Sequence, residues 1–315
     1  FMIVKKPIFW DNNKPSLISF LLLPLTIPIR LSNFLLKYSS KLKPQKIISI
    51  CVGNIYLGGT GKTPTTIKLF EIINKLKKRT VTAKKFYKSH GDEVALLEKK
   101  TKFLTGKNRS EIIGKAIKKN KEIIIFDDGL QDKDIDYNLK FVCFDSLSWI
   151  GNGHLMPSGP LREKLSSLKR FDAVFIKNIE KTNFEIINII KKINPKIKIF
   201  NSKYKIKNLN KFNLSKKYIV FSGIGNPDSF KKFLIKYKFK VIDCISFPDH
   251  YKYNKPDILK IIKKAKKLKA KIITTEKDYV KIPKVYHSKI NFLDVDLTFD
   301  NKKKLINFLK LKINA

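Results

Sequence analysis

The chain has 315 residues, more than one hydrophobic core usually serves, so we expect two domains. Hydrophobic residues make up 43 % and charged residues 30 %, a globular composition that excludes a disordered chain. Lys and Arg number 67 against 26 Asp and Glu, and this charge of +41 fits either a polyanionic partner or a lysine-rich solvated surface.

The most apolar stretch of the chain covers residues 17–31. A helix of that length spans about 22 Å, short of the roughly 30 Å hydrocarbon core of a bilayer. Two prolines and an arginine also interrupt it, which argues against a transmembrane helix. Two structures stay open: a helix packed on the domain, or an interfacial helix of about residues 15–38 with lysines behind it on lipid phosphates.

From residue 46 onward, short β-branched runs alternate with amphipathic helical patterns, which predicts a mostly parallel sheet covered on both faces. Strands are expected at 46–53, 80–83, 101–105, 122–127, 140–145, 173–176 and 196–200, and helices at 62–77, 109–119 and 183–193. A second alternation predicts strands at 218–223, 239–246, 271–275 and 290–297, and helices at 227–237, 255–268 and 301–311. A polar stretch between them predicts a domain of residues 1–206 and a smaller α/β domain of residues 207–315.

A glycine-rich segment follows the first expected strand and opens a helix. Its residues are Gly58, Gly59, Thr60, Gly61, Lys62 and Thr63. Glycines let a backbone wrap a phosphate with its N–H groups inward, and the helix amino end adds a favourable dipole. Lys62 would reach the β- and γ-phosphates, and the Thr63 hydroxyl would bind Mg²⁺. The segment therefore predicts a phosphate-binding loop, although Tyr56 replaces the first glycine of the usual motif.

An apolar run of residues 123–126 ends in two acids, Asp127 and Asp128. This pattern describes a strand that delivers a carboxylate to its C-terminal end, as in a Walker-B segment. One carboxylate would hold Mg²⁺ while the other meets Lys62 or a metal-bound water. The alternative is an ordinary charged strand end.

Two other acidic segments allow two interpretations each. Asp92 and Glu93 follow a lysine-rich stretch, and are either a solvated helix start or a functional pair. Asp249 and His250 follow an expected strand, where the histidine is either structural or oriented by the aspartate for acid–base work.

Together these segments resemble the tetraacyldisaccharide 4′-kinases, which phosphorylate the lipid A precursor. The matching stretches stand in the family's order and cover residues 52–281. They are VGNIYLGGTGKTP (52–64), GDE (91–93), DDGLQ (127–131), GNGHLMPSGPLRE (151–163), FSGIGNPDSF (221–230), FPDHYKY (247–253) and TTEKDYVK (274–281).

The resemblance implies a P-loop NTPase-like α/β domain and a smaller C-terminal α/β domain, with ATP and Mg²⁺ in the cleft between them. It implies a kinase acting on the 4′-hydroxyl of a tetraacyldisaccharide 1-phosphate. It also favours the interfacial structure for the N-terminal helix, on the anionic cytoplasmic face of the bacterial inner membrane. Neither a nucleic acid nor an obligate protein partner is expected.

Site residues follow from the matching motifs. The loop of residues 58–63 would bind ATP, with Asp127 and Asp128 at the metal and phosphates. Asp92 would take the proton of the sugar hydroxyl, paired with His250. The implied roles are catalysis for Lys62, Asp92 and His250, metal binding for Thr63, Glu93, Asp127 and Asp128, and substrate binding for Asn152 and Arg162.

The chain departs from the family pattern at two places. The family has a Ser-Arg-Gly-Tyr-Gly-like segment before GDE, where this chain reads Ala-Lys-Lys-Phe-Tyr at 83–87. The family's DDGLQ motif usually continues with His, where this chain has Asp132.

Two other classes of protein fit less well, and a zinc site is not expected. A deviant Walker-A ATPase, such as a partition ATPase, carries a signature lysine where Leu57 stands. A nucleic-acid-binding protein predicts clustered arginines, and the five arginines here are scattered. The three Cys and four His show no zinc-ligand spacing.

Overall fold

The structure is a computed structural model, which describes residues 6–38, 42–86, 91–132, 134–179, 182–249 and 251–314. The chain divides into two compact units. Within the described residues, the large unit comprises 6–86, 97–203 and 297–314, and the small unit comprises 91–96 and 204–296.

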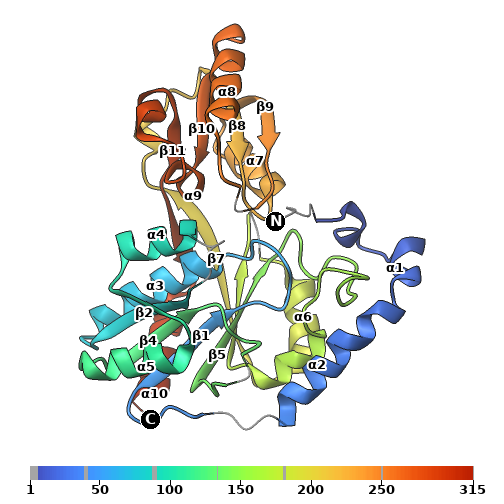
Figure 1. Cartoon of the computed structure of the whole chain (residues 1–315), viewed down its shortest axis with the longest axis vertical. Helices are drawn as coiled ribbons and strands as arrows, with labels where there is room; N and C mark the ends of the chain where they lie inside the picture. The colour runs from blue at the N-terminus through green and yellow to red at the C-terminus, as the bar shows by residue number, and fades with distance from the viewer. Residues whose placement is uncertain are drawn as a thin grey trace. The chain divides into compact units, whose positions relative to one another are not determined.

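An eight-stranded sheet forms the centre of the large unit (Figure 1). Its strands, in spatial order, are β12 (Val295–Phe299), β7 (Lys198–Ile206), β6 (Ala173–Lys177), β5 (Leu139–Asp145), β1 (Ile48–Gly53), β4 (Ile123–Asp127), β2 (Thr80–Lys85) and β3 (Phe103–Gly106). All neighbouring pairs from β7 to β3 are parallel. The carboxyl ends of β1, β2 and β4 therefore meet at one edge of the sheet.

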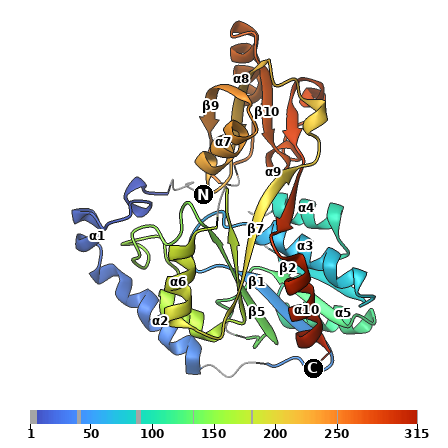
Figure 2. The same cartoon turned by 180° about the vertical axis from the view of Figure 1, so that it is seen from behind.

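Helices cover both faces of this sheet, because its central strands are apolar on both sides. They are α3 (Lys62–Lys75), α5 (Arg109–Lys118), α6 (Phe184–Ile193) and α10 (Lys302–Ile313). Ile112 of α5 and Ile190 of α6 join the buried cluster on one face. Helix α10 lies on the other face (Figure 2). There the ring of Phe308 packs on Phe141 and Phe200, at centroid distances of 6.0 and 5.5 Å. The predicted α/β fold with a mostly parallel sheet is confirmed.

The small unit has its own parallel sheet, ordered β11-β10-β8-β9. Its strands are β8 (Lys217–Ser222), β9 (Lys240–Ser246), β10 (Lys271–Thr275) and β11 (Asn291–Leu293). Helix α7 (Pro227–Lys236) packs on the face of Val220, and α8 (Lys255–Lys267) packs on the face of Ile219. Helix α9 (Glu276–Tyr279) follows β10, and α4 (Gly91–Lys100) begins in this unit.

The end of the chain differs from the sequence prediction. The single strand expected at 290–297 is two strands, β11 in the small sheet and β12 in the large one. Strand β12 runs antiparallel to β7, since Asp300 N–H donates to the Asn201 carbonyl (3.1 Å) and Lys207 N–H to the Asp294 carbonyl (2.8 Å). Residues 297–314 thus belong to the large unit, not to a C-terminal domain of residues 207–315, because their aromatic side chains pack on the large sheet.

The N-terminal segment is a broken helix, where one helix of about residues 15–38 was expected. It comprises α1 (Leu17–Leu21), a 3-10 turn (Pro24–Thr26) and α2 (Ile27–Tyr38). Proline lacks the N–H that would continue α1, so the chain turns at Pro24. Among the described residues, no helix has both the length and the apolar character needed to cross a membrane.

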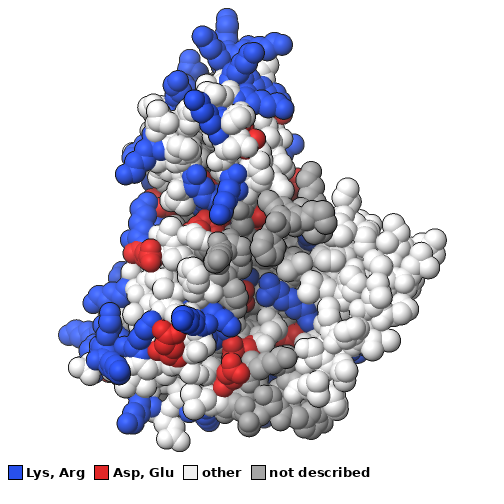
Figure 3. Space-filling view, viewed as in Figure 1, with Lys and Arg blue, Asp and Glu red and all other residues white. Residues whose placement is uncertain are grey.

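This N-terminal segment has an inverted polarity. Its polar residues Ser19 and Thr26 are buried, whereas Leu17, Leu21 and Leu25 are 76, 72 and 60 % exposed. In Figure 3 the surface at α1 carries almost no charged side chains, while lysines crowd other parts of the same face. Exposed apolar side chains gathered on one segment in this way are typical of an interaction site.

Removing the Phe308 side chain tests the attachment of α10. Phe308→Ala should lower the free energy of unfolding by about 3–5 kcal/mol, because it empties an aromatic site between helix and sheet. Leu311→Ala is the matched control, since Leu311 lies in the same helix and is 73 % exposed. Urea unfolding of both variants measures the difference, and equal midpoints would contradict the packing.

Candidate active site

The loop between β1 and α3 has the backbone that its glycine-rich sequence predicts. Gly58 and Gly61 have φ angles of 150° and 85°, which residues with a Cβ rarely adopt. The Asn54 amide donates to the Gly58 carbonyl (3.2 Å) and to Thr60 Oγ1 (3.1 Å), which closes the loop on itself. Lys62 is the first residue of α3, so the loop leads directly into a helix amino end, where anions bind.

Asp127, at the carboxyl end of β4, is a completely buried carboxylate. Its Oδ2 accepts a hydrogen bond from the Thr63 hydroxyl (2.8 Å) and one from Lys84 Nζ (3.1 Å). Lys84 Nζ also donates to the Asp127 carbonyl (3.3 Å). Sequence reasoning missed Lys84 as a site residue; the available signal was a lysine within a buried parallel strand, β2.

Asp128 lies between two cations. Its Oδ2 is 3.4 Å from Lys62 Nζ and 3.6 Å from Arg162 Nη1. All three side chains are partly exposed, at 13 to 27 % of their surface. The structure thus brings the predicted substrate residue Arg162 to the predicted phosphate residues, and the two cations offer a site for an anion.

Asp132, where the family usually has His, is paired with Arg109. Its other carboxylate oxygen accepts the N–H groups of Asp134 (2.9 Å) and Ile135 (3.0 Å). Arg109 in turn donates to the carbonyl of Asp128 (3.1 Å). In this chain Asp132 therefore supports the turn that carries Asp128.

Asn152 has a structural position. Its amide nitrogen donates to Ser19 Oγ and to the Ser158 carbonyl, both at 3.0 Å, and its Oδ1 accepts the N–H of His154 (3.1 Å). The side chain is buried, and these bonds attach the loop of residues 151–160 to the N-terminal segment. Farther along α2, Asn33 donates to the carbonyl of Arg162 (2.8 Å). The substrate role predicted for Asn152 stays a prediction.

The large unit offers oxygen ligands suited to Mg²⁺. Thr63 Oγ1 and Asp127 Oδ2 are 2.8 Å apart, and hydroxyl and carboxylate oxygens are what this cation prefers. In the described ranges, no three His, Cys, Asp or Glu side chains converge as a metal-binding group. This donor set fits a cation that takes its remaining ligands from phosphates and water.

In the small unit, three carboxylates surround one lysine. Lys277 Nζ in α9 is 3.0 Å from Asp249 Oδ1, 3.6 Å from Asp92 Oδ2 and 3.7 Å from Glu93 Oε1. Asp92 and Glu93 lie in the first turn of α4, but Asp92 is buried, so this helix start is not the solvated one that was one of the two interpretations. Burial lowers the pKa of Lys277, but the carboxylates of Asp249, Glu93 and Asp92 outweigh burial and raise its pKa above the ordinary value.

A second buried carboxylate, Asp278, fixes the position of α9. It accepts the Gly223 N–H (3.1 Å), the Thr275 hydroxyl (2.7 Å) and the Tyr253 hydroxyl (3.0 Å). Lys281 Nζ is 2.7 Å from its Oδ1. Burial first, and then Asp278, raises the pKa of Tyr253, so this phenol stays protonated as a donor.

The predicted site residues thus form two groups, one in each unit. The large unit holds the loop of residues 58–63 with Asp127, Asp128 and Arg162. The small unit holds Asp92 and Glu93. His250, predicted to pair with Asp92, lies outside the described residues.

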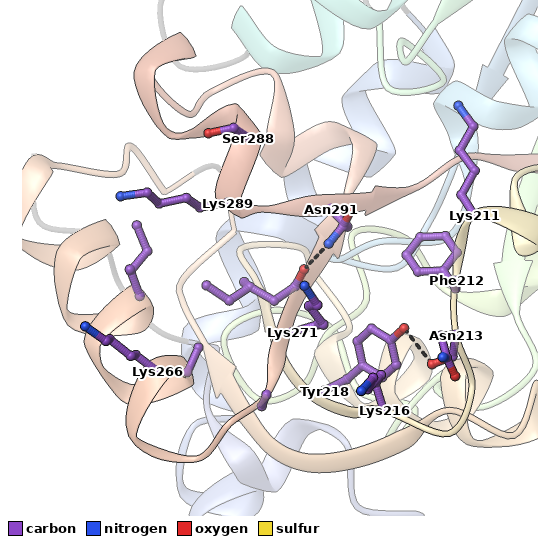
Figure 4. A pocket seen from close by; sticks show the side chains of 14 residues that line it. Lys211, Phe212, Asn213, Lys216, Tyr218, Lys266, Lys271, Ser288, Lys289 and Asn291 are labelled. Carbon is purple, nitrogen blue, oxygen red and sulfur yellow. Dashed lines mark hydrogen bonds between the residues drawn. The ribbon is translucent and has the colours of Figure 1, made fainter.

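A pocket of about 560 Å³ lies at the end of the small sheet opposite to α9 (Figure 4). Its lining includes the amino ends of β8, β10 and β11, whereas ligands of parallel sheets usually bind at carboxyl ends. None of the predicted site residues lines it. Its cationic residues are Lys211, Lys216, Lys266, Lys271 and Lys289.

Comparison with known proteins identifies the family of the chain. The family model described as tetraacyldisaccharide-1-P 4′-kinase matches residues 18–314. A tetraacyldisaccharide 4′-kinase of Pelagibacter ubique is 44 % identical over 313 residues, 99 % of each chain. One of Rickettsia canadensis is 33 % identical, covering 95 % of this chain and 94 % of the relative.

A solved structure shows the same fold. LpxK from Aquifex aeolicus, described in complex with ATP, superposes with a TM-score of 0.69 at 22 % identity. The match covers 94 % of this chain and all of the other. With a family model matching nearly the whole chain and full-length relatives at 33 to 44 % identity, the chain belongs to the tetraacyldisaccharide-1-P 4′-kinase family.

Proposed function

We propose that this chain transfers the γ-phosphate of ATP to the 4′-hydroxyl of a tetraacyldisaccharide 1-phosphate, the precursor of lipid A. The observation that carries the proposal is the position of Lys62 and Arg162 on either side of Asp128, beside a glycine loop that opens a helix. Family membership supports the choice of acceptor.

In the large unit, the loop of residues 58–63 binds the ATP phosphates and Lys62 neutralises charge on the transferred group. Thr63 and Asp127 would hold Mg²⁺, and Asp128 lies beside Lys62. When bound, the metal ion neutralises charge on the phosphate oxygens. Arg162 contacts a phosphate of either substrate, because a guanidinium offers two parallel donors to phosphate oxygens.

In the small unit, Asp92 accepts the proton of the sugar hydroxyl. The roles that the matching motifs imply for His250 and Glu93 stay predictions. A sugar hydroxyl does not ionise near neutral pH, but a loose transition state for phosphoryl transfer demands little early deprotonation. A carboxylate held close to the hydroxyl is therefore sufficient. The nearly complete burial of Asp92, whose Oδ1 accepts the Glu93 N–H (2.9 Å), supports a fixed orientation.

The N-terminal segment binds the anionic cytoplasmic face of the inner membrane. Its inverted polarity supports this assignment: polar side chains attach it to the large unit, and leucines face outward. An acyl-chain substrate is dissolved in lipid, so an enzyme that lies on the bilayer meets it there.

A phosphate-transfer assay with ATP, Mg²⁺ and a tetraacyldisaccharide 1-phosphate tests the activity. The native protein should form the bisphosphate product, and Lys62→Ala should lower the rate by about 10²-fold or more through lost electrostatic stabilisation. Lys75→Ala, an exposed lysine in the last turn of the same helix, should leave the rate unchanged. Native-like turnover by Lys62→Ala would refute the assigned loop.

Asp92→Ala should lower kcat by about 10²- to 10⁴-fold, because the sugar hydroxyl loses its proton acceptor, while ATP affinity stays close to native. The control is Asp228→Ala, which removes an exposed acid from the first turn of α7. Steady-state kinetics and nucleotide titration separate the two quantities. Lost ATP affinity with unchanged kcat would instead place Asp92 at the metal.

Replacing Leu17, Leu21 and Leu25 with Ser should release the protein from anionic vesicles, since burial of each leucine in lipid contributes roughly 1.5–3 kcal/mol. The control replaces three exposed leucines elsewhere, Leu147, Leu259 and Leu311, with Ser. Co-sedimentation measures binding. Equal binding by both triple variants would argue against this surface.

A further inference from the structure

Lys277 brings together three acidic side chains from two separate parts of the small unit. Asp92 and Glu93 come from the start of α4, and Asp249 from the segment after β9. The Lys277 side chain is only 20 % exposed, so its ammonium acts where solvent screens charge weakly. Three carboxylates this close to one point repel one another, and the ammonium offsets that repulsion.

The lysine is itself held in place. Helix α9 is fixed by Asp278, which accepts hydrogen bonds from Gly223, Thr275 and Tyr253. Lys281 follows four residues after Lys277. Its Nζ is 2.7 Å from Asp278 Oδ1 and 3.7 Å from Asp92 Oδ2. Asp92 is therefore flanked by two ammonium groups that a buried hydrogen-bonded network anchors to the small sheet.

We propose that Lys277 is a positioning residue for Asp92: its ammonium holds this carboxylate, with Glu93 and Asp249, in the arrangement that proton transfer from the sugar hydroxyl requires. The inference rests on the proposed function, since it assigns Lys277 to the step in which Asp92 acts. Lys277 touches neither substrate in this scheme. It acts mainly through the position and charge of Asp92, so its loss lowers turnover more than nucleotide affinity.

Lys277→Ala should lower kcat by about 10- to 100-fold, the usual cost of a misplaced catalytic group, with KM for ATP within about threefold of native. Lys277→Arg keeps the positive charge and should restore most of kcat. Lys264→Ala is the matched control, because Lys264 forms an ion pair with Asp243 in the same unit. Thermal unfolding of each variant shows whether it is folded.

A double variant tests whether Lys277 acts through Asp92. In an Asp92→Asn background, Lys277→Ala should change kcat by less than about threefold, since coupled residues do not contribute additively. Full additivity of the two changes would overturn the inference. So would a native kcat for folded Lys277→Ala, or equal losses in Lys277→Ala and Lys277→Arg.

The outcomes separate this inference from the proposed function. Absence of phosphate transfer by the native protein would refute the proposed function, and the inference with it. An active native protein with inactive Asp92→Asn and fully active Lys277→Ala would refute the inference alone. An Asp92→Asn variant as active as native would remove the base on which Lys277 is proposed to act.

Discussion

Burial of the Asp127 carboxylate is the constraint on which the large unit depends. A charged carboxylate without water loses several kcal/mol of solvation unless polar groups replace the water. The replacements come from the Thr63 hydroxyl and the Lys84 ammonium. Thr63 lies at the start of α3 and Lys84 lies on β2. The contacts that compensate the charge of Asp127 therefore hold α3 and the carboxyl ends of β2 and β4 in one arrangement.

The small unit solves the same problem with different residues. Asp278 is equally buried, and a backbone N–H, two hydroxyl groups and Lys281 surround it. In both units a fully buried acid lies just beyond or at the carboxyl end of a parallel strand. These networks keep the more exposed residues beside them, Asp128 and Lys277, on rigid supports.

Local sequence patterns predicted much of the fold. The strand, glycine loop and helix of residues 46–77 were readable because each step needs particular residues: β-branched side chains in the strand and glycine at positive φ in the loop. The split of residues 290–297 between two sheets was not readable, because both halves are short and the segment contains no glycine or proline to mark a break. Only packing of the following aromatic residues decides where the second half goes.

The site was predictable where a motif is contiguous, and not where contacts are distant in sequence. Lys84 meets Asp127 across 43 residues, and although its position within a buried strand is a signal, nothing in the local sequence indicates its partner. The same holds for Lys277, whose acidic neighbours come from far along the chain. Asn152 is the opposite case. It stands in a contiguous motif that predicts substrate binding, but its side chain makes hydrogen bonds with Ser19 and Ser158 of this chain.

The side chain of Asn33, in α2, donates a hydrogen bond to the carbonyl of Arg162, whose guanidinium lies beside Asp128. This bond connects the outward-facing helices to the proposed phosphate site within one unit. Within the described residues, the bonds of Asn33 and Asn152 connect α1 and α2 to the segment of residues 151–162, which belongs to the same compact unit. If α1 and α2 lie on a bilayer as proposed, the fold would set the height of the loop of residues 58–63 above it. A lipid substrate keeps its acyl chains in the bilayer, and only its sugar end rises to this height. Under the proposed function, the N-terminal segment would then do more than bind the lipid surface: it would also set the distance between that surface and the bound nucleotide.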